Sequence, residues 1–320
     1  MLTTIIQVIL LIVGFIILIK GADFFVEGAS SVAGNFRVPK MLIGLTIVAF
    51  GTSAPELAVS FQSILAGKGD LVLGNVVGSN ILNILLILGV ASMFHYLRVK
   101  RETVHKELPM LMLLTVLFAL LISDNLFAQS IINSFTRSDA LVMLLFFAIF
   151  LYYLFAMARA HHQDDTKVKY LSLPKAWLYT IGGIIAIVIG SNFVVDSASG
   201  LAAVMGVSDK LIALTIVALG TSLPELVTSV VATRRGEYDL AIGNVVGSNI
   251  FNLGFVLALP VALVGDLPPV SIDYVDIFVM ICATVILYLA AANDRKISVK
   301  EGCIFLLPFV AYYTYVIAVG

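Results

Sequence analysis

The amino-acid sequence predicts an all-α polytopic membrane protein: ten transmembrane helices in two inverted five-helix repeats, with broken helices 2 and 7 at the core. Two observations predict the membrane location. Of the 320 residues, 60% are hydrophobic and 12% are charged, whereas soluble domains have roughly 45–50% and about 25%. Apolar runs of about 20 residues, long enough to cross a bilayer, recur along the whole chain. A third observation, a long motif that occurs twice, predicts the repeats.

Composition and charge exclude several functional classes. A chain this apolar, with a mean hydropathy of +1.07, lacks the polar surface that a soluble enzyme needs. The formal net charge is -1, and no basic patch is large enough to neutralise a phosphate backbone, so nucleic acid is not an expected partner. Cys282 and Cys303 lie in apolar segments and offer neither a disulfide framework nor metal-ligand spacing. No cofactor is expected.

Ten apolar segments are the predicted transmembrane helices. The first has no basic start and is long enough to span the bilayer, so we interpret it as a helix rather than a signal peptide. A polar stretch divides the chain into a first repeat (1–158), a cytoplasmic linker (159–175) and a second repeat (176–320). The predicted segments are 4–27, 38–66, 70–94, 107–123, 138–158, 176–197, 208–233, 239–264, 273–292 and 301–319.

Lysine and arginine residues predict the orientation of these segments. Loops that follow odd-numbered segments carry 15 of the 19 basic residues, and loops that follow even-numbered segments carry three. Because cytoplasmic loops collect positive residues, both termini are expected to face the outside of the cell. Lys20, within the first segment, is expected to line an entrance or to pair with Asp23 and Glu27.

An internal repeat relates the two halves of the chain. Residues 42–83 and 211–252 align without a gap at an offset of 169 residues, and 26 of the 42 positions are identical. Each half has five segments, an odd number, so the second copy is expected to enter the membrane from the opposite side. Inverted repeats are typical of secondary transporters, whose binding sites lie where the halves meet near the middle of the membrane.

One glutamate lies in the middle of the second apolar segment of each half. Glu56 and Glu225 occupy equivalent positions, and neither has a lysine, arginine or histidine nearby in its own segment. An ionised carboxylate in the bilayer costs at least about 3 kcal/mol unless it is paired or solvated. Two facing carboxylates repel each other, so a cation between them, or a proton on one of them, is the simplest relief. The alternative is a protonated, hydrogen-bonded pair that only holds the helices together.

The residues before each glutamate predict a broken helix. In "AFGTSAPE" and "ALGTSLPE", the prolines at 55 and 224 donate no backbone hydrogen bond and disturb the carbonyl groups four residues earlier. Irregular backbone inside a membrane is tolerated where it lines a cavity. The stripe expected to face this cavity consists of Ala49, Thr52, Ser53 and Glu56 in the first repeat, and Ala218, Thr221, Ser222 and Glu225 in the second.

A second motif supplies neutral oxygen atoms. In "GNVVGSNILN" (74–83) and "GNVVGSNIFN" (243–252), a serine and an asparagine stand four residues apart on one helix face. These pairs are Ser79 with Asn83 and Ser248 with Asn252. The glycine spacing is typical of close helix packing. The remaining asparagines are left unassigned between the site and helix contacts: Asn75, Asn80, Asn244 and Asn249.

Together these residues predict an all-oxygen cation site. The candidate ligands are carboxylate, hydroxyl, amide and backbone oxygens, whereas all four histidines lie in loops or at segment ends. Such a site suits hard cations such as Ca²⁺ and Na⁺ and disfavours zinc or copper. Two negative charges balance one divalent cation, which favours calcium.

The paired motifs resemble the alpha repeats of the cation/calcium exchanger superfamily, and the ten-segment plan is similar to its compact prokaryotic sodium/calcium antiporters. The resemblance implies a cell (inner) membrane protein that exchanges Ca²⁺ for Na⁺ by alternating access, with segments 1 and 6 sliding across segments 2, 3, 7 and 8. It implies calcium at Glu56 and Glu225 with backbone oxygens of Thr52 and Thr221. It implies sodium sites at Ala49, Thr52, Ser53 and Ser248, and at Ala218, Thr221, Ser222 and Ser79.

The sequence departs from the superfamily pattern at two positions. Many relatives carry aspartate, which is associated with potassium-dependent exchange, where this chain has Asn83 and Asn252. Potassium dependence is therefore not expected, while Ca²⁺/H⁺ antiport stays open as the alternative. A calcium channel and an intramembrane enzyme are less favoured, because the inverted repeat predicts a carrier and no histidine lies mid-segment as a base. The lipid bilayer is an expected partner, with no obligate protein partner.

Overall fold

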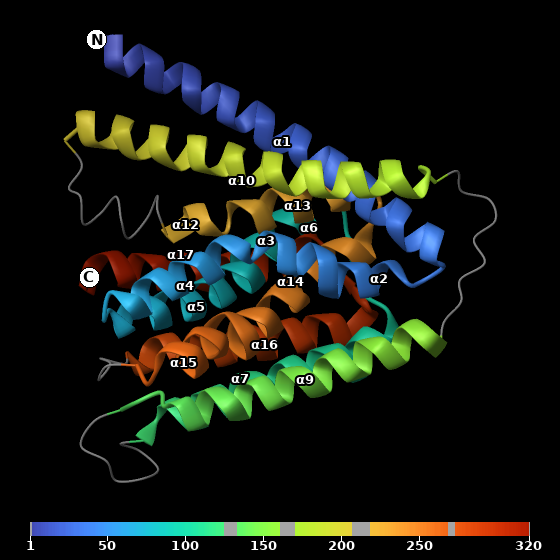
Figure 1. Cartoon of the computed structure of the whole chain (residues 1–320), viewed down its shortest axis with the longest axis vertical. Coiled ribbons are helices and arrows are strands. Elements are labelled where there is room, and N and C mark those ends of the chain that lie inside the picture. Colours follow the sequence, from blue (N-terminus) through green and yellow to red (C-terminus); the bar gives the residue numbers. More distant parts are fainter. Residues whose placement is uncertain (1, 125–132, 161–169, 207–217, 268–272, 320) are drawn as a thin grey trace.

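The protein is mostly helical, with one short two-stranded ribbon (Figure 1). The structure, a computed structural model, describes residues 2–124, 133–160, 170–206, 218–267 and 273–319. The first half comprises α1 (Leu2–Phe36), α2 (Lys40–Ile43), η1 (Gly44–Val48), α3 (Ala49–Thr52), α4 (Ala54–Leu65), α5 (Gly69–Leu82), η2 (Asn83–Leu88), α6 (Gly89–Phe94), β1 (Leu97–Arg98), η3 (Thr103–Glu107), α7 (Leu108–Ile122) and α9 (Arg137–Ala160). The second comprises α10 (Leu173–Val204), α12 (Ala218–Thr221), α13 (Leu223–Arg234), α14 (Tyr238–Phe251), η5 (Asn252–Leu257), α15 (Ala258–Val264), α16 (Tyr274–Asp294), β2 (Lys296–Ile297) and α17 (Val299–Val319). The η elements are π-helical.

Membrane-spanning helices make up most of the described chain. Within the described ranges, eight helices are long and apolar enough to cross a membrane, and a bent pair, Lys40–Thr52 with Ala54–Leu65, is a ninth candidate. The predicted seventh segment includes residues 208–217, which lie outside the described residues. The eight are Thr4–Phe36, Gly69–Phe94, Thr103–Ile122, Arg137–Arg159, Leu173–Val204, Tyr238–Val264, Tyr274–Asp294 and Val299–Ala318.

Two helices, α1 and α10, are longer than predicted and pack against each other (Figure 1). With 35 residues, α1 rises about 52 Å at 1.5 Å per residue, more than the ~30 Å hydrocarbon core. Glycines let the two backbones approach closely. A Cβ atom on Gly21 would lie 2.9 Å from Cβ of Ala186, and one on Gly190 would lie 2.6 Å from the backbone nitrogen of Leu18. Small residues hold membrane helices together in this way.

The repeated motifs form the centre of the bundle. The spans Gly69–Phe94 and Tyr238–Val264 are 72% and 83% buried in their most apolar windows, compared with 22% for α1. The elements also repeat at the sequence offset of 169 residues: α13, α14 and η5 begin and end at the positions equivalent to α4, α5 and η2. A Cβ atom on Gly243 would lie 2.9 Å from Cα of Gly44, so α14 lies directly on η1.

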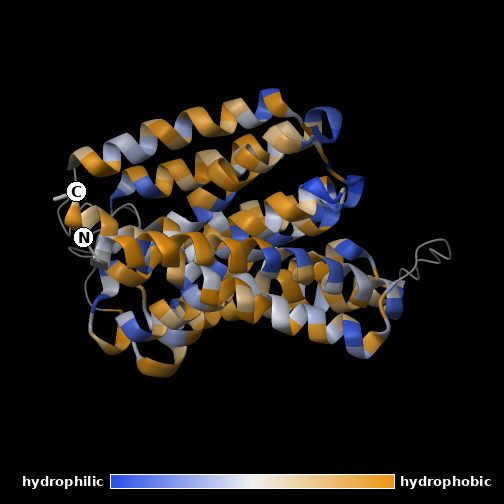
Figure 2. Ribbon diagram, turned by 90° about the horizontal axis from the view of Figure 1, so that it is seen from above, coloured by the Kyte–Doolittle hydropathy of each residue, from blue (hydrophilic) through white to orange (hydrophobic). Residues whose placement is uncertain are grey.

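The outer surface is apolar along the helices and more polar toward their ends (Figure 2). Leu145 of α9 and Leu178 of α10 are 65% and 69% exposed, as expected for side chains that face lipid. At one end, β1 pairs antiparallel with β2, and Leu97 lies opposite Ile297. The ribbon thereby joins the connections that follow the third and ninth predicted segments.

Candidate cation-binding site

Two helix breaks position the candidate site. The helical run α2–η1–α3 ends at Ser53 (φ -83°, ψ 6°), and α4 continues at an angle of 46°. The second half repeats the break at Ser222 (φ -90°, ψ 2°), between α12 and α13. Pro55 and Pro224 lie in the first turn of the helices that follow, where a missing N–H group costs nothing. The prolines thus start new helices at both predicted positions.

Each break places a glutamate in the first turn of the next helix. The side chains of Glu56 and Glu225 are 1% and 0% exposed, and a helix N-terminus favours negative charge. The hydroxyl of Ser53, in the first break, donates to Oε1 of Glu225 at 3.2 Å. Among the described residues, no lysine, arginine or histidine forms a salt bridge with either glutamate.

Hydroxyl groups of the breaks meet the serines of the central helices. Oγ1 of Thr52 lies 3.5 Å from Oγ of Ser248 and 3.0 Å from Oδ1 of Asn244. In the other half, the hydroxyl of Ser222 donates to Ser79 at 3.4 Å. Each break therefore contacts the central helix of the opposite half, and these hydroxyls are all buried.

Three further predicted ligands lie at the breaks in different ways. Ala49 is fully buried, and its carbonyl accepts from the backbone N–H of Ser53 at 2.9 Å. Thr221 is partly exposed at the end of α12, and Ala218 is the first residue of that helix.

Asparagines that the sequence left unassigned hold both glutamate helices in place. Nδ2 of Asn75 donates to the backbone carbonyl of Glu56 at 3.1 Å and to Ser60 at 3.3 Å. Nδ2 of Asn244 repeats this arrangement with the carbonyl of Glu225 at 3.3 Å and Ser229 at 2.9 Å. The sequence feature that could have indicated this role is that each asparagine follows its glutamate by 19 residues.

Four buried oxygen atoms around the breaks have no hydrogen-bond partner among the described residues. They are Oε2 of Glu56, Oε2 of Glu225, Oδ1 of Asn83 and Oδ1 of Asn252. They come from elements that pack crosswise, since η5 contacts α4 and η2 contacts α13. A buried acceptor without a donor costs about 1–3 kcal/mol, and more when it is charged. Carboxylate and amide oxygens of this kind are ligands that a hard cation prefers.

The donor set fits a hard cation. Within the described residues, no group of three or more histidine, cysteine, aspartate or glutamate side chains could hold a metal. The candidate ligands are instead two carboxylates with amide and hydroxyl oxygens, which suit Ca²⁺ or Na⁺.

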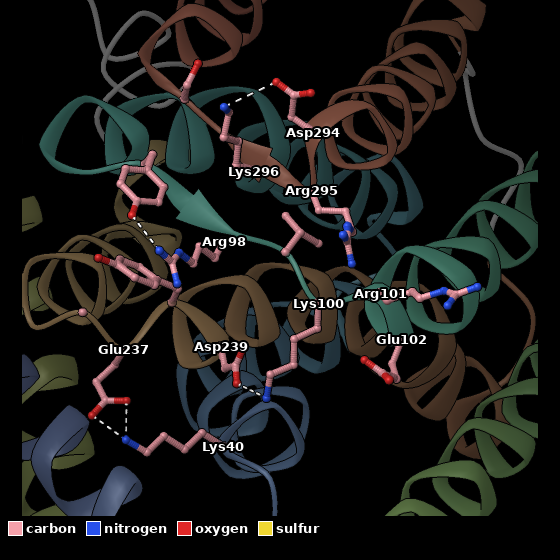
Figure 3. A pocket seen from close by; sticks show the side chains of 15 residues that line it. Lys40, Arg98, Lys100, Arg101, Glu102, Glu237, Asp239, Asp294, Arg295 and Lys296 are labelled. Atoms are coloured by element: carbon pink, nitrogen blue, oxygen red, sulfur yellow. Dashed lines mark hydrogen bonds and ion pairs between the residues drawn. The ribbon is translucent and has the colours of Figure 1, made fainter.

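A separate group of charged residues lines a cavity of about 1030 Å³ at the end that carries the ribbon. Nζ of Lys40 contacts both carboxylate oxygens of Glu237 at 2.8 Å. Nζ of Lys100 lies 2.5 Å from Asp239. Figure 3 shows both lysines pointing toward their carboxylate partners. These two ion pairs connect lysines of the first half to the carboxylates at the start of α14.

The fold and the two facing breaks define an integral membrane protein of the exchanger type. The sequence profile described as sodium/calcium exchanger protein matches residues 6–156 and 175–318. The chain belongs to this sodium/calcium exchanger family.

Individual relatives cover nearly the whole chain. It is 38% identical over 315 residues to a protein described as an antiporter, CaxA of Alkalimonas amylolytica, covering 95% of this chain and 96% of that protein. It is 30% identical over 340 residues to the sodium/calcium exchanger MaX1 of Methanosarcina acetivorans, covering 95% and 96%. The solved structure of the sodium-calcium exchanger NCX_Mj, soaked with 10 mM Na⁺ and zero Ca²⁺, superposes with a TM-score of 0.83 at 31% identity, covering 98% and 99%. The membrane fold is therefore shared with an exchanger.

Proposed function

We propose that this chain is a secondary antiporter that exchanges Ca²⁺ for Na⁺ across the cell membrane by alternating access. The observation that carries the proposal is that four buried oxygens, on Glu56, Glu225, Asn83 and Asn252, find no hydrogen-bond partner in the part of the chain that the structure describes. Two of them are carboxylates, so the site has a charge of -2 when both are ionised, and one Ca²⁺ neutralises it. The names of the related exchangers support the same ions.

The ligands divide between the two ions. Glu56 and Glu225 bind calcium together with backbone oxygens of Thr52 and Thr221 and the amide oxygens of Asn83 and Asn252. Sodium ions occupy the hydroxyl-rich flanks beyond the carboxylates. Those flanks consist of Ala49, Thr52, Ser53 and Ser248 on one side and Ala218, Thr221, Ser222 and Ser79 on the other.

Transport requires access to this site from each side of the membrane in turn. We place the ten helices as two inverted five-helix repeats, 1–158 and 176–320, with both termini outside and the linker 159–175 in the cytoplasm. The long helices α1 and α10 form one packed pair on the side of the bundle (Figure 1). They move as that pair across the central helices and expose the site alternately.

The hydroxyl groups beside the two carboxylates favour sodium over protons as the coupling ion. Two protons or two sodium ions neutralise the site, and a third sodium ion leaves a charge of +1, which hydroxyl and carbonyl dipoles must stabilise. The buried serines Ser53, Ser79, Ser222 and Ser248 supply such dipoles, and a pure proton exchanger would not need them. Exchange of three sodium ions for one calcium is electrogenic, so an inside-negative potential accelerates sodium-driven calcium extrusion.

The test is isotope uptake of calcium into proteoliposomes under separate sodium and proton gradients. Uptake that follows the sodium gradient and responds to membrane potential is the expected result. Uptake that follows a pH gradient and ignores sodium on both sides would favour the Ca²⁺/H⁺ alternative and retain the glutamate site. Downhill calcium flux without any counter-ion would support a channel instead.

Orientation is tested by labelling single cysteines in a variant that lacks Cys282 and Cys303. Arg101 and Lys68 are exposed and lie in connections that follow the third and second predicted segments. Arg101→Cys should react with a membrane-impermeant reagent only from the cytoplasm, and Lys68→Cys only from outside. The opposite pattern would reverse the proposed topology.

A further inference from the structure

We infer that Asn80 and Asn249 are positioning residues that set the amide orientation of Asn83 and Asn252, so that an oxygen rather than an N–H group faces the bound cation. The inference rests on the proposed function. It assigns a role to two asparagines of the repeated motif that are each 1% exposed and whose amide nitrogens donate to backbone carbonyls.

A backbone carbonyl fixes the first amide. Nδ2 of Asn249 lies 3.3 Å from the main-chain oxygen of Asn80. A carbonyl oxygen only accepts hydrogen bonds, so the amide of Asn249 must turn its nitrogen toward it. Oδ1 of Asn249 therefore occupies the opposite side of the group.

The fixed amide of Asn249 orients the next one. Its Oδ1 also only accepts, so the neighbouring Asn83 must present Nδ2, and it does so at 2.9 Å. Oδ1 of Asn83 is thereby directed away from this contact, and it is buried without a hydrogen-bond partner among the described residues. The order of donors along this relay leaves no freedom to exchange nitrogen and oxygen at Asn83 without breaking a buried hydrogen bond.

The same relay runs in the opposite direction. Nδ2 of Asn80 donates to the main-chain oxygen of Asn249 at 3.3 Å. Oδ1 of Asn80 accepts from Nδ2 of Asn252 at 3.1 Å, and Oδ1 of Asn252 has no hydrogen-bond partner within the described ranges. The amide of Asn83 is thus oriented by Asn249, which the backbone carbonyl of Asn80 holds in place. The amide of Asn252 is oriented by Asn80, which the backbone carbonyl of Asn249 holds in place.

An asparagine ligand needs a fixed orientation because the two ends of its amide group differ in chemistry. An aspartate at position 83 or 252 would present oxygen in either rotation of its end group. An asparagine presents oxygen in one rotation and an N–H group, which repels a cation, in the other. An aspartate at position 80 or 249 could not donate to the carbonyl that fixes the relay, so asparagine is required there.

A double-mutant cycle in proteoliposomes tests this role. Asn249→Leu is close in size and removes both contacts of the relay. It should raise the calcium KM about tenfold, the effect expected for losing one contact to a charged group. In an Asn83→Asp background no orientation is needed, and the carboxylate, which only accepts, opposes Oδ1 of Asn249. The same change should therefore leave the KM unchanged or lower it.

Several outcomes would overturn the inference. If Asn249→Leu raises the calcium KM equally in the unsubstituted protein and in Asn83→Asp, Asn249 serves helix packing alone. If it leaves the calcium KM of the otherwise unsubstituted protein unchanged, Asn249 has no role in calcium binding. Should Asn249→Leu fail to fold, Asn80→Leu with and without Asn252→Asp gives the mirror-image test. Calcium-dependent thermal stabilisation of the purified variants reports the same affinities without turnover.

Glu56→Gln in the same assay separates this inference from the proposed function. If Glu56→Gln abolishes transport but the effects of Asn249→Leu and Asn83→Asp on the calcium KM are additive, only the orienting role is rejected. Normal transport in Glu56→Gln would reject the cation site itself.

Discussion

The two halves of the chain share their helix breaks and their asparagine contacts at the candidate site, and they differ where their long helices meet the core. Around the site, asparagine contacts are reciprocal and element bounds repeat at one offset. Farther out, Arg235 lies 3.1 Å from Asp23 and 3.4 Å from Glu27, which joins α1 to the end of α13. The residues at the equivalent positions of the other half are Ala66, Asn192 and Asp196.

This contrast separates two requirements on an exchanger. A site that must bind the same ions from either side of the membrane benefits from equal halves. In the proposed alternating-access mechanism, the attachment of the long helices would set which side the site faces. Of α1 and α10, α1 has an arginine at this contact. Ser30 of α1 adds a hydrogen bond to Glu237 at 3.0 Å at the same end. We therefore expect site substitutions to act equally in both halves and attachment substitutions to act on one side only.

The largest expected effect tests the equality of the halves. Glu56→Gln and Glu225→Gln each remove one of two charges that face a divalent ion, so calcium transport should fall at least ~100-fold in either variant. Initial rates of calcium uptake in proteoliposomes measure this. Near-normal exchange in both variants would reject the paired-carboxylate site, and a large difference between them would reject equivalence.

An intermediate effect concerns sodium. Ser79 and Ser248 are buried beside the opposite breaks, in flanks that we assign to sodium rather than calcium. Ser79→Ala and Ser248→Ala should each raise the sodium concentration for half-maximal exchange by about five- to tenfold, the effect of one lost contact to a cation. The calcium KM should change by less than about twofold. A larger shift for calcium than for sodium would reverse the assignment.

Sequence reasoning could predict the breaks and the glutamates because both depend on local chemistry. Proline removes a backbone hydrogen-bond donor, and here each proline closely follows a glycine-threonine-serine run; a carboxylate in an apolar segment needs a partner. The asparagine relay could not be predicted, because it depends on how two helices 169 residues apart are rotated against each other.

The partners of Asp23 show the same limit. The sequence predicted that it lines an entrance or pairs within its segment. Lys20 does lie 4.0 Å away, but the shorter contact, to Arg235, comes from the other half of the chain. The lengths of α1 and α10 were underestimated because their polar ends are stabilised by packing on each other rather than by lipid.

The smallest expected effect tests the attachment of α1. Arg235, Asp23 and Glu27 are about one-third exposed, and partly exposed ion pairs contribute at most about 1 kcal/mol. Arg235→Gln should therefore shift the balance between the two facing states by no more than about fivefold. Because the pair lies at the end predicted to be cytoplasmic, breaking it should lower the calcium KM on that side and raise it on the other.

Sided flux measurements with a matched control decide this point. Arg234, the preceding residue, lies over the ring of Phe94 and forms no salt bridge within the described residues, so Arg234→Gln should leave the ratio of the two KM values unchanged. Asp23→Asn should reproduce part of the shift of Arg235→Gln, because Arg235 also contacts Glu27. Combining the two should add little to Arg235→Gln alone, since that change already removes both contacts. Raising ionic strength with choline chloride should shrink the difference from the unsubstituted protein, because salt screens exposed charges. Equal shifts in Arg234→Gln and Arg235→Gln would assign the effect to overall surface charge and remove the asymmetry between the halves.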